Sequence, residues 1–362
     1  MSEVNDSGEA FRDRMRAHHR IVLLTDGHST PFLAKTAISL LRYRGSDIAA
    51  VLDRQADCQN AAKLFSVGGD TPVVGSVTEI ADADALYIGI APPGGRMPSE
   101  WRALILEALE RGVDVVSGLH EFLIDDVQYV DAAEQSGAAL IDVRRNRHRS
   151  TATAWKPIAG NVRIHAVGHD CSVGKMVAML ELQRGLAAAG QDAEFLATGQ
   201  TGIMISGRGV PVDCVVADFV NGAAEQLVVD HANHDFLLIE GQGSISHPAF
   251  SAVTAGLLHG CAPDGLLFCY EAGRTKVKGL TDSMIPDMKQ QLEVCLSFAN
   301  LRHPCRAIGV AVNTRQLTED QVDKELRWAE DTFGLPACDV YRTGVDRLVE
   351  ASLSLRREIV SQ

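Results

Sequence analysis

Short apolar runs alternate with helical patterns along the first part of the chain. The apolar runs predict strands over residues 21–25, 48–52, 72–74, 85–90 and 113–117. Between them, residues 32–43 and 100–111 show the spacing of amphipathic helices, and Gly112 ends the second of these. Strands that alternate with helices form βαβ units, so this region predicts a parallel sheet.

A second alternation follows a basic run at 144–149 and a linker that contains Pro157. Its predicted strands cover residues 162–167, 194–197, 236–239, 265–269 and 307–312. Its predicted helices cover residues 175–189 and 319–333, and a short one follows Val345. The fold class is therefore α/β, with a polar tail over 1–19, a first domain over 20–150 and a second over 151–362.

The segment 164–176 joins a predicted strand to a predicted helix through a glycine-containing loop. Such a loop cradles phosphate with its backbone N–H groups, while a lysine and the helix N-terminus add positive charge. A phosphate-binding loop (P-loop) is one interpretation, and an ordinary turn with a surface lysine is the other. Under the first, the nucleotide-binding candidates are Gly168, His169, Asp170, Cys171, Ser172, Val173, Gly174, Lys175 and Met176.

Met176 departs from the usual pattern, because it stands where P-loop enzymes have a serine or threonine that binds Mg²⁺. A thioether does not bind a hard cation. Either carboxylates alone hold the metal, or the reaction is not metal-dependent phosphoryl transfer. Cys171 lies close to the helix N-terminus, where a thiolate or an acyl-cysteine is conceivable, although a packed small residue is the simpler interpretation.

Several segments together resemble one bacterial family, long described as a domain of unknown function, whose characterised member is a D-glutamate N-acetyltransferase. They are G-H-D-C-S-V-G-K-M at 168–176, T-G-Q-T-G at 198–202, D-F-V-N-G-A-A-E at 218–225, E-G-Q-G-S at 240–244 and, in the first half, A-K-T-A at 34–37 and the break at 92–95. The loop more distantly resembles that of dethiobiotin synthetase. The resemblance covers roughly residues 20–350 and implies a Rossmann-like domain followed by a P-loop NTPase-like domain with a mostly parallel sheet.

Candidate catalytic and metal-binding residues lie at the ends of predicted strands. Glu240 follows the strand 236–239 beside the loop, where carboxylates reach a metal in P-loop proteins. The resemblance adds Asp218 as a second acid for Mg²⁺. The catalytic candidates are Lys175, Glu240, Asp170 and His247, the last as a general base or as an unremarkable loop histidine.

Polar loops supply the candidates for substrate binding. Thr198, Gln200 and Thr201 offer donors to a carboxylate or a carbonyl oxygen, and Gln242 and Ser244 form a second group. Arg274 follows a further strand and could clamp an anionic substrate. Asn313, at the end of the strand 307–312, resembles the asparagine that reads adenine in related P-loop enzymes, with a strand cap as the alternative.

Composition narrows the partners. The formal net charge of −13 disfavours nucleic acid and anionic membranes. Eight cysteines without a C-x-x-C pair, and no secretory or membrane-spanning segment, indicate reduced thiols and a cytoplasmic location. In the first domain, Asp26-Gly27-His28-Ser29-Thr30 replaces the G-x-G-x-x-G fingerprint, although Asp53 stands where a ribose-binding acid would.

Three functions remain open. An N-acyltransferase would use acetyl-CoA to acylate a small acidic amino acid, D-glutamate by resemblance, and would bind the ADP part of CoA in the loop. An ATP- and Mg²⁺-dependent ligase or carboxylase of the dethiobiotin synthetase type would use the loop for ATP or ADP. A nucleotide-sensing ATPase would do no small-molecule chemistry. We expect a homo-oligomer.

Overall fold

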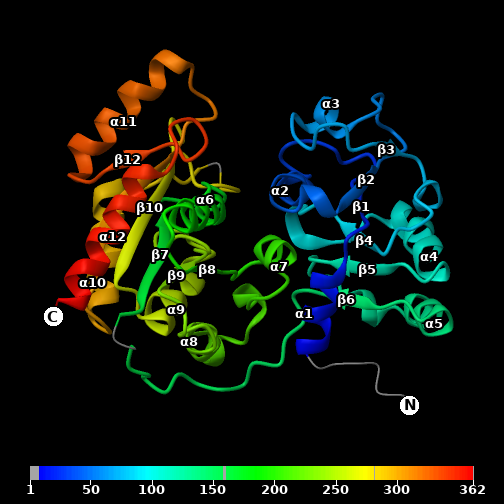
Figure 1. Ribbon diagram of the computed structural model, residues 1–362, viewed down its shortest axis with the longest axis horizontal. Coiled ribbons are helices and arrows are strands. Elements are labelled where there is room, and N and C mark those ends of the chain that lie inside the picture. The colour runs from blue at the N-terminus through cyan, green and yellow to red at the C-terminus, as the bar shows by residue number, and fades with distance from the viewer. Residues whose placement is uncertain (1–7, 158–159, 281, 362) are drawn as a thin grey trace. The chain divides into compact units, whose positions relative to one another are not determined.

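The computed structural model describes residues 8–157, 160–280 and 282–361 (Figure 1). The chain forms two compact units. Unit 1 comprises the described part of residues 1–146 together with Ile203–Pro211. Unit 2 comprises the described parts of Arg147–Gly202 and Val212–Gln362.

Unit 1 is a parallel six-stranded sheet with strand order β3-β2-β1-β4-β5-β6, which is the order of the dinucleotide-binding Rossmann fold. Its strands are β1 (Ile21–Leu24), β2 (Ile48–Leu52), β3 (Val73–Val74), β4 (Ala85–Ile88), β5 (Asp114–Ser117) and β6 (Leu140–Asp142). Its helices are α1 (Gly8–Ala17), α2 (Lys35–Tyr43), α3 (Ala61–Phe65), α4 (Arg102–Glu110) and α5 (Val127–Ser136). The strands are apolar on both faces because helices cover the sheet, and the core cluster gathers around buried Trp101.

Helix α1 lies inside the segment that the sequence predicts to be a polar tail. Its Met15 is buried, and the guanidinium of Arg14 donates to both carboxylate oxygens of Asp114 in β5 at 2.5 and 2.6 Å. The adjoining His18 lies within hydrogen-bond distance of both Asp114 and Tyr87, at 3.0 Å from each. The helix has few apolar residues, and polar contacts hold it against the sheet. Its apolar pattern in the sequence is therefore weak.

Unit 2 is a second parallel six-stranded sheet, with strand order β12-β11-β10-β7-β9-β8. Its strands are β7 (Val162–Gly168), β8 (Ala193–Leu196), β9 (Phe236–Ile239), β10 (Gly265–Glu271), β11 (Arg306–Asn313) and β12 (Ala337–Cys338). Its helices are α6 (Lys175–Ala188), α8 (Val220–Val229), α9 (Ser251–Cys261), α10 (Met288–Asn300), α11 (Glu319–Phe333) and α12 (Asp346–Val360). Helix α7 (Gln200–Ser206) begins in unit 2 and ends in unit 1.

Helices cover both faces of the second sheet. Helices α6 and α12 pack against each other on one face, and the cluster around Phe268 places α9, α10 and α11 on the other (Figure 1). The α/β fold class is thus confirmed, with two parallel six-stranded sheets in succession along the chain. Within the described ranges, no helix combines the length and the apolar character that crossing a bilayer demands.

Candidate functional site

The loop between β7 and α6 forms a nest of backbone N–H groups. Two residues in left-handed conformation, Ser172 (φ 56°) and Gly174 (φ 107°), turn the chain into the helix at Lys175. Within the described residues, no protein acceptor receives the backbone N–H groups of residues 172–176. Five such groups at a helix N-terminus form a binding site for an anion such as phosphate.

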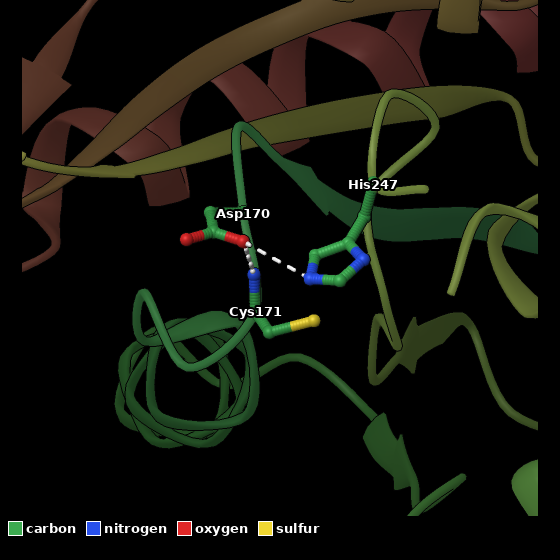
Figure 2. A group of neighbouring side chains, drawn as sticks. All are labelled: Asp170, Cys171 and His247. Carbon is green, nitrogen blue, oxygen red and sulfur yellow. Dashed lines mark hydrogen bonds and ion pairs between the residues drawn. The ribbon is translucent and has the colours of Figure 1, made fainter. Parts of the chain in front are cut away.

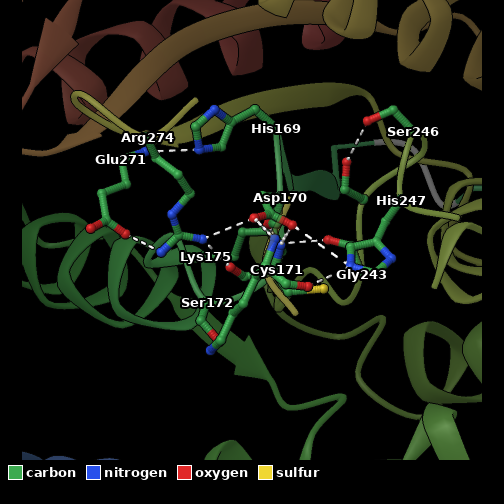
Figure 3. Close-up of polar contacts among 12 residues, drawn as sticks. His169, Asp170, Cys171, Ser172, Lys175, Gly243, Ser246, His247, Glu271 and Arg274 are labelled. Carbon is green, nitrogen blue, oxygen red and sulfur yellow. Dashed lines mark hydrogen bonds and ion pairs between the residues drawn. The ribbon is translucent and has the colours of Figure 1, made fainter. Parts of the chain in front are cut away.

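Lys175 is buried behind this nest. Its Nζ donates to the carbonyl oxygens of Asp170 and Gly243, each at 2.8 Å (Figure 3). Burial lowers the pKa of the lysine, and the nearby thiols and carboxylates oppose that shift. Only glycine fits at position 241, because a Cβ there would come within 1.7 Å of the Ala166 carbonyl and 2.8 Å of the Lys175 side chain.

Glu240 is a buried carboxylate at the end of β9. Its Oε2 accepts hydrogen bonds from the backbone N–H groups of Thr198 (2.9 Å) and Gly199 (3.0 Å), and Gln242 donates to Oε1 at 3.1 Å. Burial raises the pKa of Glu240 to about 7; the two backbone hydrogen bonds oppose this shift, and the charge of Asp213 adds to it. A carboxyl group with a pKa near neutrality can both accept and release a proton.

The Asp170 carboxylate lies at the centre of the loop's polar contacts (Figure 3). It accepts from the backbone N–H of Cys171 at 2.7 Å, from the backbone N–H of Lys278 at 2.8 Å and from Arg274 at 3.0 Å. Arg274 also pairs with Glu271, and a second arginine, Arg315, reaches Glu271 at 2.8 Å. Asp170 therefore braces the loop, and Arg274 is already engaged by two carboxylates.

His247 is buried, and its ring is held from both sides. Its Nδ1 accepts the backbone N–H of Ala249 at 3.1 Å, so Nε2 carries the proton and faces the Lys278 carbonyl at 3.3 Å. Figure 2 shows the same ring beside Asp170, 3.9 Å from Nε2 to Oδ1. In this arrangement His247 acts as a hydrogen-bond donor, and neither ring nitrogen has the open lone pair that a general base needs.

Possible metal ligands rarely lie close together around the loop. Among the described residues, the one group of three possible ligands whose atoms lie within 4.8 Å of one another is Asp170, Cys171 and His247 (Figure 2). The proton on His247 Nε2 and the Arg274 guanidinium bonded to Asp170 disfavour binding of a further cation at this group of three. Asp218 is exposed in the 3₁₀ turn Ala217–Phe219, and neither it nor Glu240 belongs to such a group.

The polar segment 198–202 lies against Glu240. On sequence grounds we placed this segment and Gln242 in two separate groups, whereas Thr198 and Gln242 both bond to Glu240. The hydroxyl of Thr198 donates to the Glu240 carbonyl at 2.8 Å, Gln200 begins α7, and Thr201 is buried. A Cβ at Gly202 would approach Glu240 Oε2 to 2.5 Å, so this segment needs its glycine. Gln242 joins the same cluster through its bond to Glu240.

Other candidates occupy supporting positions. Ser244 is fully buried and faces Gln291 of α10 at 3.3 Å. Asn313 ends β11, and its Oδ1 accepts the backbone N–H of Arg315 at 3.2 Å. Burial lowers the pKa of His169 to about 4, and its Nε2 accepts the Glu271 N–H. Burial raises the pKa of the Cys171 thiol, which disfavours the thiolate that an acyl-cysteine would need.

Three charged residues near the loop are absent from the sequence-based candidates: Glu271, Lys278 and Arg315. The backbone N–H of Lys278 reaches Asp170 from a position 108 residues further along the chain. The spacing Arg274-x-Lys276-x-Lys278 after a predicted strand is the one signal that could have pointed there.

Sequence comparisons agree with this architecture. The sequence model of the DUF1611 P-loop domain, a domain of unknown function, matches residues 152–349, and that of the DUF1611 Rossmann-like domain matches residues 54–146. The chain belongs to the DUF1611 family. A DUF1611 family protein from Anabaena variabilis, whose crystal structure is known, is 33% identical in sequence to this chain. The two structures match with a TM-score of 0.87, over 93% of this chain and 99% of the Anabaena variabilis chain.

Two curated relatives of this DUF1611 chain bear the name D-glutamate N-acetyltransferase. The protein from Tritonibacter scottomollicae is 42% identical over 277 residues, which cover 75% of this chain and 81% of the relative. The protein from a Pseudoalteromonas species is 40% identical over 296 residues, which cover 79% and 88%. Both alignments extend over more than either domain alone.

Proposed function

We propose that this protein is an N-acetyltransferase that moves the acetyl group of acetyl-CoA to the amine of D-glutamate. The two curated relatives are named for this activity. The observation that carries the proposal is the loop itself, which combines an open nest of N–H groups with a buried lysine and has Met176 where a metal-binding hydroxyl would stand. Such a loop can hold the diphosphate of CoA without cleaving it.

In the proposed reaction, Glu240 takes a proton from the substrate ammonium group. The free amine then attacks the thioester carbonyl carbon, and a C–N bond forms as the carbonyl electrons move onto oxygen. Collapse of this intermediate breaks the C–S bond, the CoA thiolate leaves with the electron pair, and the proton left on the new amide nitrogen is released. With its pKa raised to about 7, Glu240 can take up and release a proton near neutral pH and serves as this base.

Donors around Glu240 serve the substrate and the developing oxyanion. Gln242, bonded to Glu240 Oε1, and the segment 198–202 at the start of α7 offer amide and hydroxyl groups to a carboxylate. His247, for which the sequence offered the roles of general base and of unremarkable loop histidine, supports the site indirectly, because its Nε2 N–H faces the Lys278 carbonyl beside the loop. Arg274 assists indirectly, by holding Asp170 in place.

Incubation of the purified chain with acetyl-CoA and either D- or L-glutamate tests this function. We expect release of free CoA thiol and formation of an N-acetylated product, detected by mass spectrometry, with preference for the D-isomer. Lys175→Met removes the charge behind the loop and should lose the activity. Turnover of ATP with Mg²⁺ in the absence of acetyl-CoA would instead favour the ligase or the nucleotide-sensing ATPase. A homo-oligomer in the cytoplasm stays a prediction, which light scattering and cell fractionation can check.

A further inference from the structure

A short hairpin follows β10 in unit 2 and crosses beside the phosphate loop. Lys276 and Met284 form an antiparallel bridge, Val277 N–H donates to the Ser283 carbonyl at 2.9 Å, and Ile285 N–H donates to the Thr275 carbonyl at 2.8 Å. These bonds give the segment 275–280 a defined conformation.

Lys278 connects this hairpin to the phosphate loop through three of its own groups. Its backbone N–H donates to Asp170 at 2.8 Å, and its carbonyl lies 3.3 Å from the protonated Nε2 of His247. Its Nζ donates to the Ser172 hydroxyl at 2.7 Å. Because the backbone is held at two points, the ammonium group is placed at the edge of the N–H nest, whose first member is Ser172 itself.

We propose that Lys278 is a second phosphate-binding lysine, which together with Lys175 neutralises the CoA diphosphate in place of Mg²⁺. This inference rests on the proposed function, because it takes CoA as the ligand of the loop. A diphosphate diester carries one negative charge on each phosphate, and the two lysines supply one positive charge each. Met176 removes the hydroxyl that would hold a metal, so the chain supplies the charge from the hairpin instead.

The energetics favour a phosphate over the Ser172 hydroxyl as the partner of the Lys278 ammonium. A hydrogen bond between two charged groups is roughly twice as strong as one to a neutral acceptor. A lysine acts as a point charge on a flexible stem, so it can turn from the hydroxyl to an oxygen of an anion in the nest while the backbone stays bonded to Asp170. Arg274 is less available for this role, since its guanidinium is paired with Asp170 and Glu271.

Calorimetric titration of CoA and of ADP into the full chain, with either EDTA or Mg²⁺ present, tests the inference. We expect CoA to bind equally well in both buffers. Lys278→Met, which keeps the aliphatic stem, should weaken both ligands by about 10- to 100-fold, consistent with the loss of one charged hydrogen bond. Lys276→Met, on the same hairpin and exposed, is the matched control and should stay within about twofold. The KM for acetyl-pantetheine, which lacks the diphosphate, should not change in either variant.

The outcomes separate the inference from the proposed function. Binding of CoA that needs Mg²⁺, or equal losses in Lys278→Met and Lys276→Met, would overturn the role of Lys278 while leaving the acetyltransferase intact. Metal-free binding of ADP that is lost in Lys278→Met, with no binding of CoA, would uphold the lysine and overturn the acetyltransferase. Failure of the wild-type chain to bind either ligand would overturn both.

Discussion

The two units share a doubly wound parallel sheet, yet the carboxyl ends of their strands differ. In unit 2, the N–H groups of residues 172–176 after β7 have no protein acceptor within the described chain. In unit 1, the corresponding edge after β1 and β2 is filled by the chain's own carboxylates. Asp53 accepts the N–H groups of Gly27 at 3.0 Å and Gln55 at 2.9 Å, together with the Ser29 hydroxyl.

A second carboxylate forms hydrogen bonds at the same edge of unit 1. Asp26 is fully buried and accepts the backbone N–H of Arg54 at 2.7 Å and its guanidinium at 2.6 Å. A dinucleotide would place its pyrophosphate and ribose at these two positions in a Rossmann fold. We call this hydrogen-bonded position the closed edge of unit 1. One fold class carries both arrangements, so the fold alone says little about ligands.

Removal of the buried lysine should have the largest effect on affinity for CoA. It tests directly whether unit 2 rather than unit 1 binds the ligand. Lys175→Met leaves the nest of N–H groups without its buried charge, and we expect affinity for CoA to fall by at least about 100-fold, as for a lost charged contact. Arg54→Met, at the closed edge of unit 1, should change it by less than about twofold. Calorimetry measures both. Equal losses would mean that the edge of unit 1 also binds the ligand.

Replacing the buried carboxylate Glu240 tests whether this residue is the base of the reaction. Glu240→Gln keeps the acceptor for Thr198 and Gly199 but removes the base, so kcat should fall by about 10²- to 10⁴-fold. In the wild type, kcat should rise with pH and level off above the pKa of about 7. A pH profile that stays flat from pH 5 to pH 9 would rule out Glu240 as the base.

The same substitution should stabilise the protein at high pH. The folded-state pKa of Glu240 is about 7, above the value of 4.5 that is usual for a glutamate side chain, so the folded protein binds the proton more tightly than the unfolded chain. Stability is therefore lost as pH rises through this window, by an amount on the order of 3 kcal/mol. Glu240→Gln avoids that loss, so its Tm should exceed that of the wild type at pH 8 and match it near pH 4. A lower Tm at pH 8 would contradict the assigned burial.

A smaller effect should come from crowding the same carboxylate. Gly202→Ala places a Cβ 2.5 Å from Glu240 Oε2, so either α7 or the carboxylate must shift. We expect kcat to fall by about tenfold and the protein to lose about 1–3 kcal/mol of stability, as is typical of overpacking. Gly45→Ala in unit 1 has no atom within 4 Å and serves as the matched control. An unchanged kcat in Gly202→Ala would show that this segment adapts freely.

Local pattern predicted much of the fold. The strands Ile48–Leu52 and Phe236–Ile239 and the helix Glu319–Phe333 agree with their predicted bounds. The helix has clear signals at both ends, with a capping box at Thr318 and left-handed Gly334. Helices α8 and α9 were not predicted, because their apolar residues do not follow one face: the two helices pack against each other and are buried over much of their surface.

The residues of the candidate site also fall into two groups, those that the sequence located and those that it did not. The strand–loop–helix signature located the nest and Lys175, and the position after a buried strand located Glu240. The role of His247 could not be read from sequence, since it depends on which nitrogen accepts the Ala249 N–H. Lys278 and Glu271 reach the loop from about a hundred residues away along the chain, through contacts that only the parallel pairing of β7 with β10 creates.

The smallest effect should come from Asp53, and it tests the closed edge itself. In Asp53→Asn, the amide oxygen can still accept the N–H groups of Gly27 and Gln55, and the amide NH₂ can donate to Ser29. Only the charge is lost, so we expect about 1 kcal/mol of destabilisation in a denaturant titration, with CoA affinity unchanged. Addition of NAD should raise the Tm of neither protein, because the chain's own N–H groups and hydroxyl occupy the carboxylate that a ribose would need. Stabilisation of the wild type by NAD that is lost in Asp53→Asn would show that this edge opens to a ligand after all.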